Sequence, residues 1–476
     1  MSPQEHAGID FGGFITEKTH SFTGREWVFK ELHLWLSQPN EPRFFLLNGK
    51  PGSGKTAIAA RLCQFSRDEA TPPDGLSLFS KDFLAAYHFC SARDSNWIDP
   101  RSFVWSVALQ LAKRYDEFAK ALISAGDTPV SLSGEANAEV AEQNSVVAGI
   151  IIKNLSLSGM NSQEAFNRFL VGPLQKMYQQ GFSQPITILV DSLDESLNHS
   201  GNVTIASLLA RVKHLPSQVR FIVTSRDDDR LTIDFLEDSK LVPLSESSHR
   251  SDNDKDIANL VRLQMSNVND LKQKTASLST NDLDQLIGTI VQQAEGNFLY
   301  VAFLLNSLAM PHHSLSDLDS LPTGLEGLYY DSIKRVVSLG SGTWQATYSP
   351  LMGVLSVAQS PFTIDQIEQF TQQAANEVWL GINDLQQFIA KTNADSNSPN
   401  LKLVYRLYHQ SVIDFLHTPL LKIKGNAINN AYLNTLPAIS SLLPAIRPNQ
   451  ANSLVRAGAN RLAANEVGSR RAHQEF

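Results

Sequence analysis

The stretch "RFFLLNGKPGSGKTAIAARL", residues 43–62, joins an uninterrupted apolar run to a glycine-rich turn and then to a helical pattern. An apolar run without alternation is typical of a strand that is buried on both faces of a parallel sheet. The turn contains Gly49, Gly52 and Gly54, and glycine allows backbone conformations and close approaches that other residues resist. Beyond the turn, apolar residues recur with helical spacing. We therefore predict a strand over 43–48, a tight loop and a helix.

The turn satisfies the pattern G-x-x-x-x-G-K-[ST], in which backbone N–H groups surround a phosphate. The helix that follows directs its positive N-terminal dipole at the same anion. Lys55 can reach the β- and γ-phosphate oxygens as a point charge, and the Thr56 hydroxyl can bind Mg²⁺. We therefore expect ATP or ADP with Mg²⁺ as cofactor. The residues of this stretch expected to contact the nucleotide are Gly49, Lys50, Pro51, Gly52, Ser53, Gly54, Lys55, Thr56 and Ala57.

A second apolar run ends in carboxylates, in "ITILVDSLDES", residues 186–196. Asp191 directly follows the apolar residues, where a carboxylate can hold hydrated Mg²⁺ through its waters. Asp194 and Glu195 come just after it, and either can orient or activate the attacking water. The spacing does not decide between these two carboxylates, although we favour Glu195 as the base.

A third run, "FIVTSRDDD" at 221–229, ends in hydroxyls and an arginine. At the carboxyl edge of a sheet, Arg226 can stabilise or sense the terminal phosphate. The alternative is an ion pair between Arg226 and the aspartates that follow it, in a solvated turn. The predicted catalytic residues are thus Lys55, Asp194, Glu195 and Arg226.

The alternation of apolar strands with helices predicts a doubly wound α/β layer of the P-loop NTPase type, with ligands beyond the carboxyl ends of the strands. From about residue 240 the pattern becomes helical, and "LKLVYRLYHQSVIDFL", 401–416, has an alternating run that leads into a helix. We expect a helical lid and then a winged-helix domain. The predicted domains are a short lead at 1–20, a nucleotide-binding domain at 21–238, the lid at 239–325, the winged helix at 326–420 and a tail at 421–476.

The composition is that of a globular protein, with 42% hydrophobic and 18% charged residues in a chain of 476. A net charge of −8 argues against broad binding to nucleic acid or anionic membranes. Two cysteines cannot form a disulfide framework and fit a reducing compartment. Because no signal peptide or membrane-spanning run is visible, we expect a cytoplasmic protein with no membrane partner.

With these motifs in order, the chain resembles the NACHT branch of the signal transduction ATPases with numerous domains, the STAND class. "FTGRE" at 22–26 resembles the element before the phosphate loop that lies near the adenine, which implies a nucleotide contact for Arg25. The loop at 49–56 is similar to the Walker A motif, and "ILVDSLDES" at 188–196 to the NACHT form of Walker B. "FIVTSR" at 221–226 is similar to the sensor-1 strand.

Two later segments extend the resemblance. "EGNFLYVAFLL", 295–305, is similar to the helical lid over the base, although Phe298 stands where many relatives have a proline that contacts adenine. "YHQSVIDFL", 408–416, resembles the winged-helix segment whose histidine touches the β-phosphate of ADP. The resemblance therefore implies that His409 contacts the nucleotide.

The resemblance implies a signalling switch that hydrolyses ATP slowly. ADP would hold a closed state, and exchange for ATP would open it and allow self-association, as in innate-immunity or defence sensors. Its sensor and effector parts would be further domains or separate chains. The main alternative is a P-loop ATPase that acts on nucleic acid through its winged helix. A small-molecule kinase is less favoured, because residues 227–260 are acid-rich where a basic lid is needed.

Overall fold

A computed structural model describes residues 9–124, 160–226, 228, 231, 238–310, 315, 321–337, 344–358, 360–393, 403–417, 422–423 and 426–427. The chain divides into two compact units, Met1–Leu260 and Val261–Phe476, and the division falls inside one long helix. The tail expected at 421–476 lies outside the described residues except for 422–423 and 426–427.

The first unit alternates strands and helices along the chain. Its strands are β1 (Phe44–Asn48), β2 (Ala86–Phe89), β3 (Ile186–Asp191), β4 (Val219–Ser225) and β5 (Ser239–Pro243). Its α-helices are α1 (Gly12–Thr19), α2 (Glu26–Ser37), α3 (Lys55–Ser66), α4 (Ser95–Ile98), α5 (Pro100–Arg114), α6 (Asp116–Ser124), α8 (Ser162–Phe166), α9 (Gly172–Gln179), α10 (Ile205–Leu209) and α12 (Arg250–Asn267), which continues into the second unit. Short helical turns are η2 (Asn167–Val171), η3 (Leu193–Asn198), η4 (Val212–His214) and η6 (Ser247–His249).

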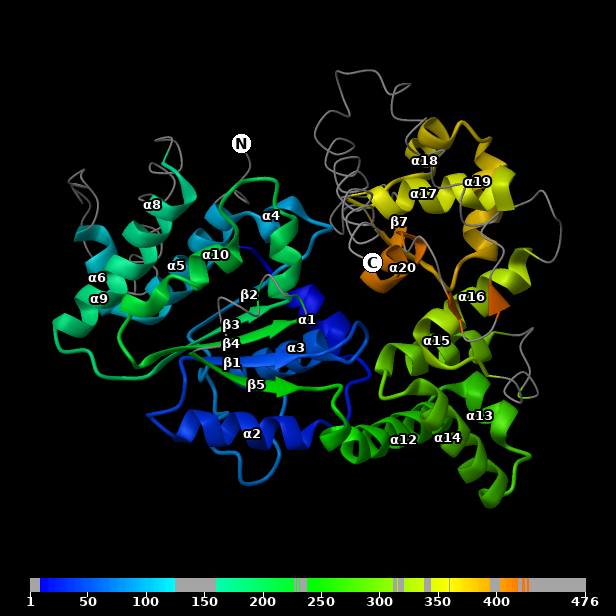
Figure 1. Ribbon diagram of the computed structural model, residues 1–476, viewed down its shortest axis with the longest axis horizontal. Helices are drawn as coiled ribbons and strands as arrows, with labels where there is room; N and C mark the ends of the chain where they lie inside the picture. The colour runs from blue at the N-terminus through cyan, green and yellow to red at the C-terminus, as the bar shows by residue number, and fades with distance from the viewer. Residues whose placement is uncertain are drawn as a thin grey trace, which may run out of the picture. The chain divides into compact units, whose positions relative to one another are not determined.

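The five strands form one parallel sheet in the order β2-β3-β4-β1-β5 (Figure 1). β1 lies between β4 and β5, so Phe44 pairs with Phe221 on one side and with Ser239 on the other. Because all strands are parallel, the loops after β1, β3 and β4 leave the sheet at the same edge. The predicted mixed α/β fold class is confirmed.

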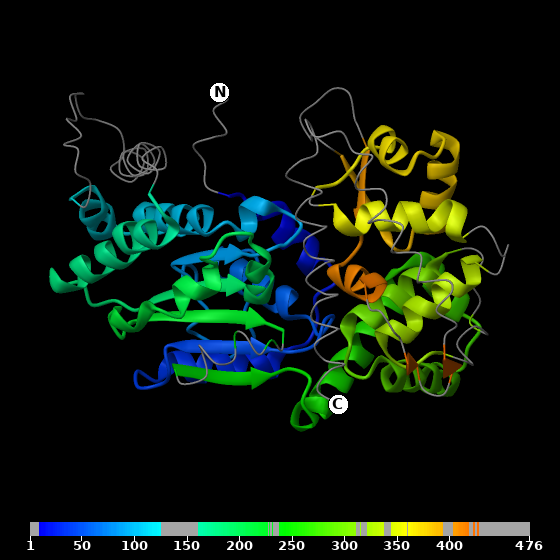
Figure 2. The ribbon, with the colours of Figure 1, turned by 45° about the horizontal axis from the view of Figure 1, so that its top comes forward.

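Helices cover both faces of the sheet (Figure 2). Alternate residues of β1 point to opposite faces, since Phe44 and Leu46 pack in the hydrophobic cluster that includes α5 and α9, while Phe45 and Leu47 pack in the cluster that includes α2 and α3. Each such fully buried side chain contributes about 1.5–3 kcal/mol to folding. The sheet is therefore doubly wound, as the uninterrupted apolar runs predicted.

β5 and α1 are among the elements of this unit that were not predicted. β5 at the sheet edge is short and half exposed, so it lacks the apolar run that identified the other strands. Since β5 begins at Ser239, the predicted boundary at 238 falls just before a strand of the same sheet. Within the expected N-terminal lead, α1 buries Ile15 against the α3 side of the sheet, next to buried Phe11.

The second unit is mostly helical. Its helices are α13 (Asn269–Thr275), α14 (Thr280–Ala294), α15 (Phe298–Ala309), α16 (Gly324–Val337), η8 (Trp344–Tyr348), α17 (Ser349–Val357), α18 (Ile364–Thr371), α19 (Ala375–Asp384) and α20 (Gln410–His417). Its strands are β6 (Ile389–Asn393), β7 (Leu403–Leu407), β8 (Lys422–Ile423) and β9 (Asn426–Ala427). The alternating run is strand β7, it leads into α20 as predicted, and it pairs antiparallel with β6. Among the described residues, no helix is long and apolar enough to cross a membrane.

His88 on β2 is fully buried among aromatic rings. Its Nε2 lies 2.9 Å from the carbonyl oxygen of Trp97, which can only accept, so the proton is on Nε2. Phe11 and Phe103 contact the ring edge-on, at centroid distances of 5.5 and 5.2 Å. Burial lowers the pKa of His88 to about 4, because the imidazolium cannot be solvated there.

The burial of neutral His88 predicts that the folded protein loses stability as the pH decreases. Unfolded His88 takes up a proton near its ordinary pKa of 6.5, whereas the folded protein resists until about pH 4, so stability falls as pH drops through this window. The loss should reach on the order of 3 kcal/mol at the acid end. In His88→Gln the amide can still donate to Trp97 but does not titrate. Urea unfolding between pH 7 and 4.5 should show a shallower decline for this variant, and equal slopes would contradict the assignment.

Candidate functional site

The loop between β1 and α3 is tightly wrapped. Gly52 and Gly54 have left-handed φ values of 82° and 89°, which favour glycine. A Cβ on Gly49 would lie 2.8 Å from Ser53 Oγ and 3.2 Å from Leu244 Cβ, so any larger residue there would displace the Ser53 hydroxyl. The loop ends at the N-terminus of α3, whose first residues are Lys55, Thr56 and Ala57. The backbone N–H groups at that helix start are the ones a phosphate can accept from.

The Lys55 side chain lies inside this loop and is only 8% exposed. Its Nζ donates to the carbonyl oxygens of Gly49 at 2.5 Å and Lys50 at 3.1 Å, and lies 3.5 Å from Ser53 Oγ. The ammonium is thus held by the same turn whose N–H groups would surround the phosphate. Lys50 itself is exposed, and its backbone N–H donates to Ser245 Oγ at 3.2 Å.

Asp191 at the end of β3 is 1% exposed and fully engaged in hydrogen bonds. Thr224 Oγ1 donates to Asp191 Oδ1 at 2.6 Å, and Ser192 Oγ donates to Oδ2 at 2.9 Å. Burial raises the pKa of the Asp191 carboxyl, and these hydrogen bonds oppose the shift. Ser192 Oγ also lies 3.4 Å from Thr56 Oγ1, so the two predicted magnesium ligands are bridged by one hydroxyl.

Thr224 and Ser192 also belong to this candidate site, although neither was assigned a role from the sequence. Thr224 lies on β4, which pairs with β3 through Val223 and Val190. The Thr224 hydroxyl also accepts from the Ser192 N–H at 2.8 Å. Ser192 has a left-handed φ of 55°, which bends the chain directly after Asp191. Only the strand order brings Thr224 to Asp191.

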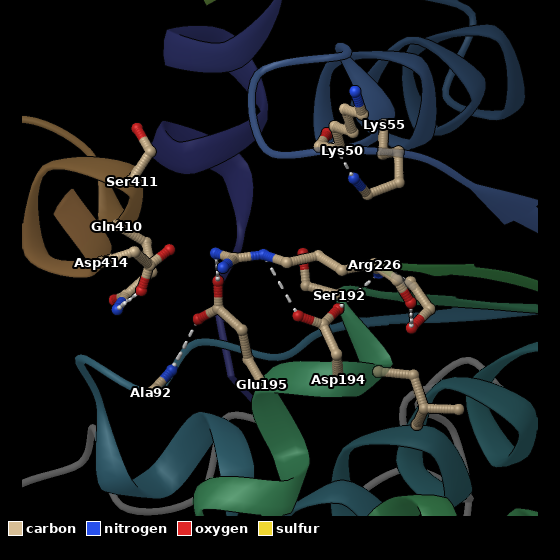
Figure 3. Close-up of polar contacts among 12 residues, drawn as sticks. Lys50, Lys55, Ala92, Ser192, Asp194, Glu195, Arg226, Gln410, Ser411 and Asp414 are labelled. Atoms are coloured by element: carbon tan, nitrogen blue, oxygen red, sulfur yellow. Dashed lines mark hydrogen bonds and ion pairs between the residues drawn. The ribbon is translucent and has the colours of Figure 1, made fainter. Parts of the chain in front are cut away.

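Arg226, Asp194 and Glu195 form one cluster beside the end of the sheet (Figure 3). Arg226 Nε lies 3.3 Å from Asp194 Oδ2, and its backbone N–H donates to Asp194 Oδ1 at 3.1 Å. Its Nη2 lies 3.9 Å from Glu195 Oε1, while Glu195 Oε2 accepts from the Ala92 N–H at 2.8 Å. The structure therefore brings the two candidate bases and the arginine together.

The electrostatics of this cluster centre on Glu195. Burial raises the pKa of the Glu195 carboxyl, and the charge of Asp194 raises it further. The guanidinium of Arg226 acts in the opposite direction. A carboxylate with a raised pKa is a better proton acceptor than a free glutamate, so Glu195 is suited to the role of base.

Two further predicted site residues lie elsewhere in the chain. Arg25 precedes α2 and is 2% exposed, and its guanidinium donates to the Ser53 carbonyl oxygen within the loop. His409 belongs to the second unit and stands immediately before α20. Its Nδ1 accepts from the Ser411 backbone N–H at 3.1 Å.

The donor set fits a magnesium nucleotide. A buried lysine and helix-terminal N–H groups suit phosphate oxygens, while a hydroxyl and a carboxylate are the ligand types that Mg²⁺ takes beside phosphates. Together with the strand order and the loop after β1, these residues define a P-loop fold of the doubly wound α/β class.

A family model described as "Nephrocystin 3, N-terminal" matches residues 24–145. That range holds the phosphate loop but neither Asp191 nor Arg226. Among solved structures, the chain is similar to the Aeropyrum pernix ORC1 protein in complex with DNA, with 12% identity and a TM-score of 0.32, over 82% of this chain and 91% of that one. A likeness of this degree assigns no role to the chain. No curated protein matches the sequence.

Proposed function

We propose that this chain is an ATP-dependent signalling switch of the NACHT type within the STAND class. It would bind ADP or ATP with Mg²⁺, hydrolyse ATP slowly and self-associate in the ATP state, in a cytoplasmic setting. Lys55 would hold the β- and γ-phosphates, and Thr56 with Asp191 would hold the metal, which neutralises phosphate charge. The domain limits at 21–238, 239–325 and 326–420 belong to this proposal.

The observation that carries the proposal is the pairing of Arg226 with both candidate bases. In this pairing the guanidinium stabilises the ionised Glu195 carboxylate, which lowers the pKa of that group and makes it a weaker base. A γ-phosphate offers Arg226 a more strongly charged partner. If Arg226 turns to the γ-phosphate, the pKa of Glu195 rises further and its basicity increases. ADP lacks that phosphate, so one arginine can distinguish the two nucleotides.

The environment of His409 supports its proposed role as a phosphate contact. Because the Ser411 N–H donates to His409 Nδ1, this nitrogen carries a lone pair, and the neutral ring therefore carries its proton on Nε2. Ser411 Oγ lies 2.8 Å from the same Nδ1 and 2.9 Å from Tyr329 Oη, so a buried pair of hydroxyls fixes the ring. Nε2–H is then a defined donor for an oxygen of ADP.

In the proposed cycle, ADP stabilises a closed monomer because both Lys55 and His409 bind its phosphates. Exchange for ATP adds a γ-phosphate that draws Arg226 from Asp194 and Glu195 and favours an open form. Each nucleotide shifts the equilibrium only by its difference in affinity for the two forms. Slow hydrolysis then returns the protein to the closed form. The proposed role is the core of an innate-immunity or defence-type sensor.

The proposal can be tested by measuring the molecular size of the protein with each nucleotide. Light scattering should show a monomer with ADP and a larger assembly with a non-hydrolysable ATP analogue, because only the analogue supplies a γ-phosphate for Arg226. Arg226→Gln should give the same size with both nucleotides while still binding ADP. His409→Ala should release ADP faster than the wild type does.

Monomers under every condition, with both nucleotides bound at saturation, would count against the switch. DNA-stimulated ATP hydrolysis with a steep dependence on salt would instead favour the nucleic-acid ATPase.

A further inference from the structure

Arg25 occupies an unfavourable backbone conformation in a buried position. Its φ is 67°, and the preceding Gly24 has a φ of 72°, so two consecutive residues are left-handed before α2. For a residue other than glycine this conformation is costly, and it persists where surrounding contacts impose it. A Cβ on Gly24 would lie 2.3 Å from Asp256 Oδ1, so this turn is pressed against α12.

The Arg25 side chain joins the phosphate loop to α12. Its Nη2 donates to the carbonyl oxygen of Ser53, and its Nη1 donates to Asn253 Oδ1. Its backbone N–H donates to Asp256 Oδ2 at 3.0 Å. Arg25, Ser53 and Asn253 are each less than 5% exposed, so water does not readily replace these hydrogen bonds.

Asn253 in turn connects to the other end of the loop. It is 2% exposed, and its Nδ2 donates to the Leu244 carbonyl oxygen at 2.7 Å. The Leu244 N–H donates to the carbonyl oxygen of Asn48 at 2.7 Å, directly before Gly49. The start of α12 is therefore linked to both ends of the phosphate loop, through Leu244 and through Arg25.

The hydrogen bond from Arg25 to the Ser53 carbonyl oxygen sets the orientation of the peptide between Ser53 and Gly54, and this orientation matters for phosphate binding. In a trans peptide the C=O and the N–H point in opposite directions. When Arg25 holds the Ser53 carbonyl, the Gly54 N–H of the same peptide points away from Arg25. Gly54 follows Ser53 at the start of α3, where phosphate-binding N–H groups are expected.

We propose that Arg25 is a positioning residue, which together with Asn253 fixes the peptide between Ser53 and Gly54 for phosphate binding and so couples nucleotide binding to the order of α12. This inference rests on the proposed nucleotide site. It differs from the resemblance, which implies that Arg25 contacts the nucleotide itself. Burial lowers the pKa of Arg25 to about 10, with Asp256 opposing the shift, so the guanidinium is still charged at neutral pH.

Such coupling is reciprocal: if an ordered α12 favours ADP, then ADP must stabilise α12 to the same extent. The test therefore uses two measurements on the full chain, the dissociation constant for ADP and amide hydrogen exchange across residues 250–260. We expect Arg25→Met and Asn253→Leu each to raise the dissociation constant about 10- to 100-fold, because each removes a buried hydrogen bond to a charged group. The double variant should be little worse than either single one, since both break the same connection.

Arg25→Lys provides a variant that keeps the buried charge if Arg25→Met is unstable. A single ammonium cannot reproduce the two-pronged guanidinium, so this variant should also weaken ADP binding and lose the ADP-induced slowing of exchange at 250–260. Asp254→Ala is the matched control on the same helix. It removes an ion pair with Arg250, whose side chain is 43% exposed, and should stay within about twofold of the wild type.

The outcomes separate the two proposals. If the wild type binds no ADP, the nucleotide site itself is refuted and this inference with it. If the wild type binds ADP while folded Arg25 and Asn253 variants bind equally well, or if their effects add independently, only the positioning role is overturned. ADP-dependent protection at 250–260 that survives in Arg25→Lys would likewise contradict the coupling.

Discussion

Lys55→Ala is expected to raise the dissociation constant for ADP at least about 100-fold. In the wild type, the ammonium is buried within the loop, where it lies near the carbonyl oxygens of Gly49 and Lys50. A phosphate bound in that loop would meet a positive charge with little intervening water, and such charge-assisted hydrogen bonds are stronger than neutral ones. Alanine removes the charge and leaves the phosphates to the backbone alone.

The measurement pairs a titration with a fluorescent ADP analogue and a thermal unfolding scan with and without ADP. A ligand that binds only the folded state stabilises it by RT ln(1 + [L]/Kd), so at an ADP concentration well above the wild-type Kd the wild type should gain stability and Lys55→Ala should gain far less. Lys30→Ala is a control for the loss of a lysine, because that side chain is 62% exposed and lies 4.0 Å from Glu26. Equal ADP affinity in Lys55→Ala and the wild type would rule out this loop as the phosphate site.

The sequence predicted the parts of the site that are local along the chain. The loop, Lys55 and Thr56 are contiguous with strand β1, and Asp191 follows an apolar run, so their positions beside the sheet can be predicted from spacing alone. Three of the strands that carry the site, β1, β3 and β4, were also predicted, because buried parallel strands are apolar throughout. β5 was missed because only one of its residues is buried.

Contacts between residues far apart in the chain could not be predicted from the sequence patterns. Thr224 bonds to Asp191 only because β4 lies next to β3, and strand order is not encoded in local spacing. Arg25 reaches Asn253 across 228 residues, so nothing near "FTGRE" indicates its partner. Arg226 was placed near the terminal phosphate by its position after a strand, but its ion pairs with Asp194 and Glu195 depend on how two strand ends meet.

The second large effect is expected at Glu195. Glu195→Gln should lower kcat for ATP hydrolysis by about 100-fold or more, because an amide cannot accept the proton of the attacking water. ADP affinity should change less than about threefold, since the Glu195 carboxylate bonds to the Ala92 N–H and Arg226 and not to the phosphate loop. The Gln side-chain oxygen can still accept from Ala92, so the fold around β3 should be kept.

The pH dependence follows from the same carboxylate. Glu195 must be ionised to act as a base, so kcat should fall as the pH decreases through its pKa. Because burial and Asp194 raise that pKa, the fall should begin at a higher pH than for an ordinary glutamate, and Glu195→Gln should lose this dependence.

Asp194→Asn distinguishes the two carboxylates that spacing left open. Asp194 bonds to both the backbone and the side chain of Arg226, so its loss should misplace the arginine and lower kcat only about 10-fold. It should also remove one of the charges that raise the pKa of Glu195, which shifts the pH profile of kcat to lower pH. The opposite result would be a larger loss of kcat in Asp194→Asn, together with loss of its pH dependence, while Glu195→Gln keeps both the wild-type kcat and the pH dependence. In that case Asp194 is the base, and Glu195 serves to hold Ala92 and Arg226.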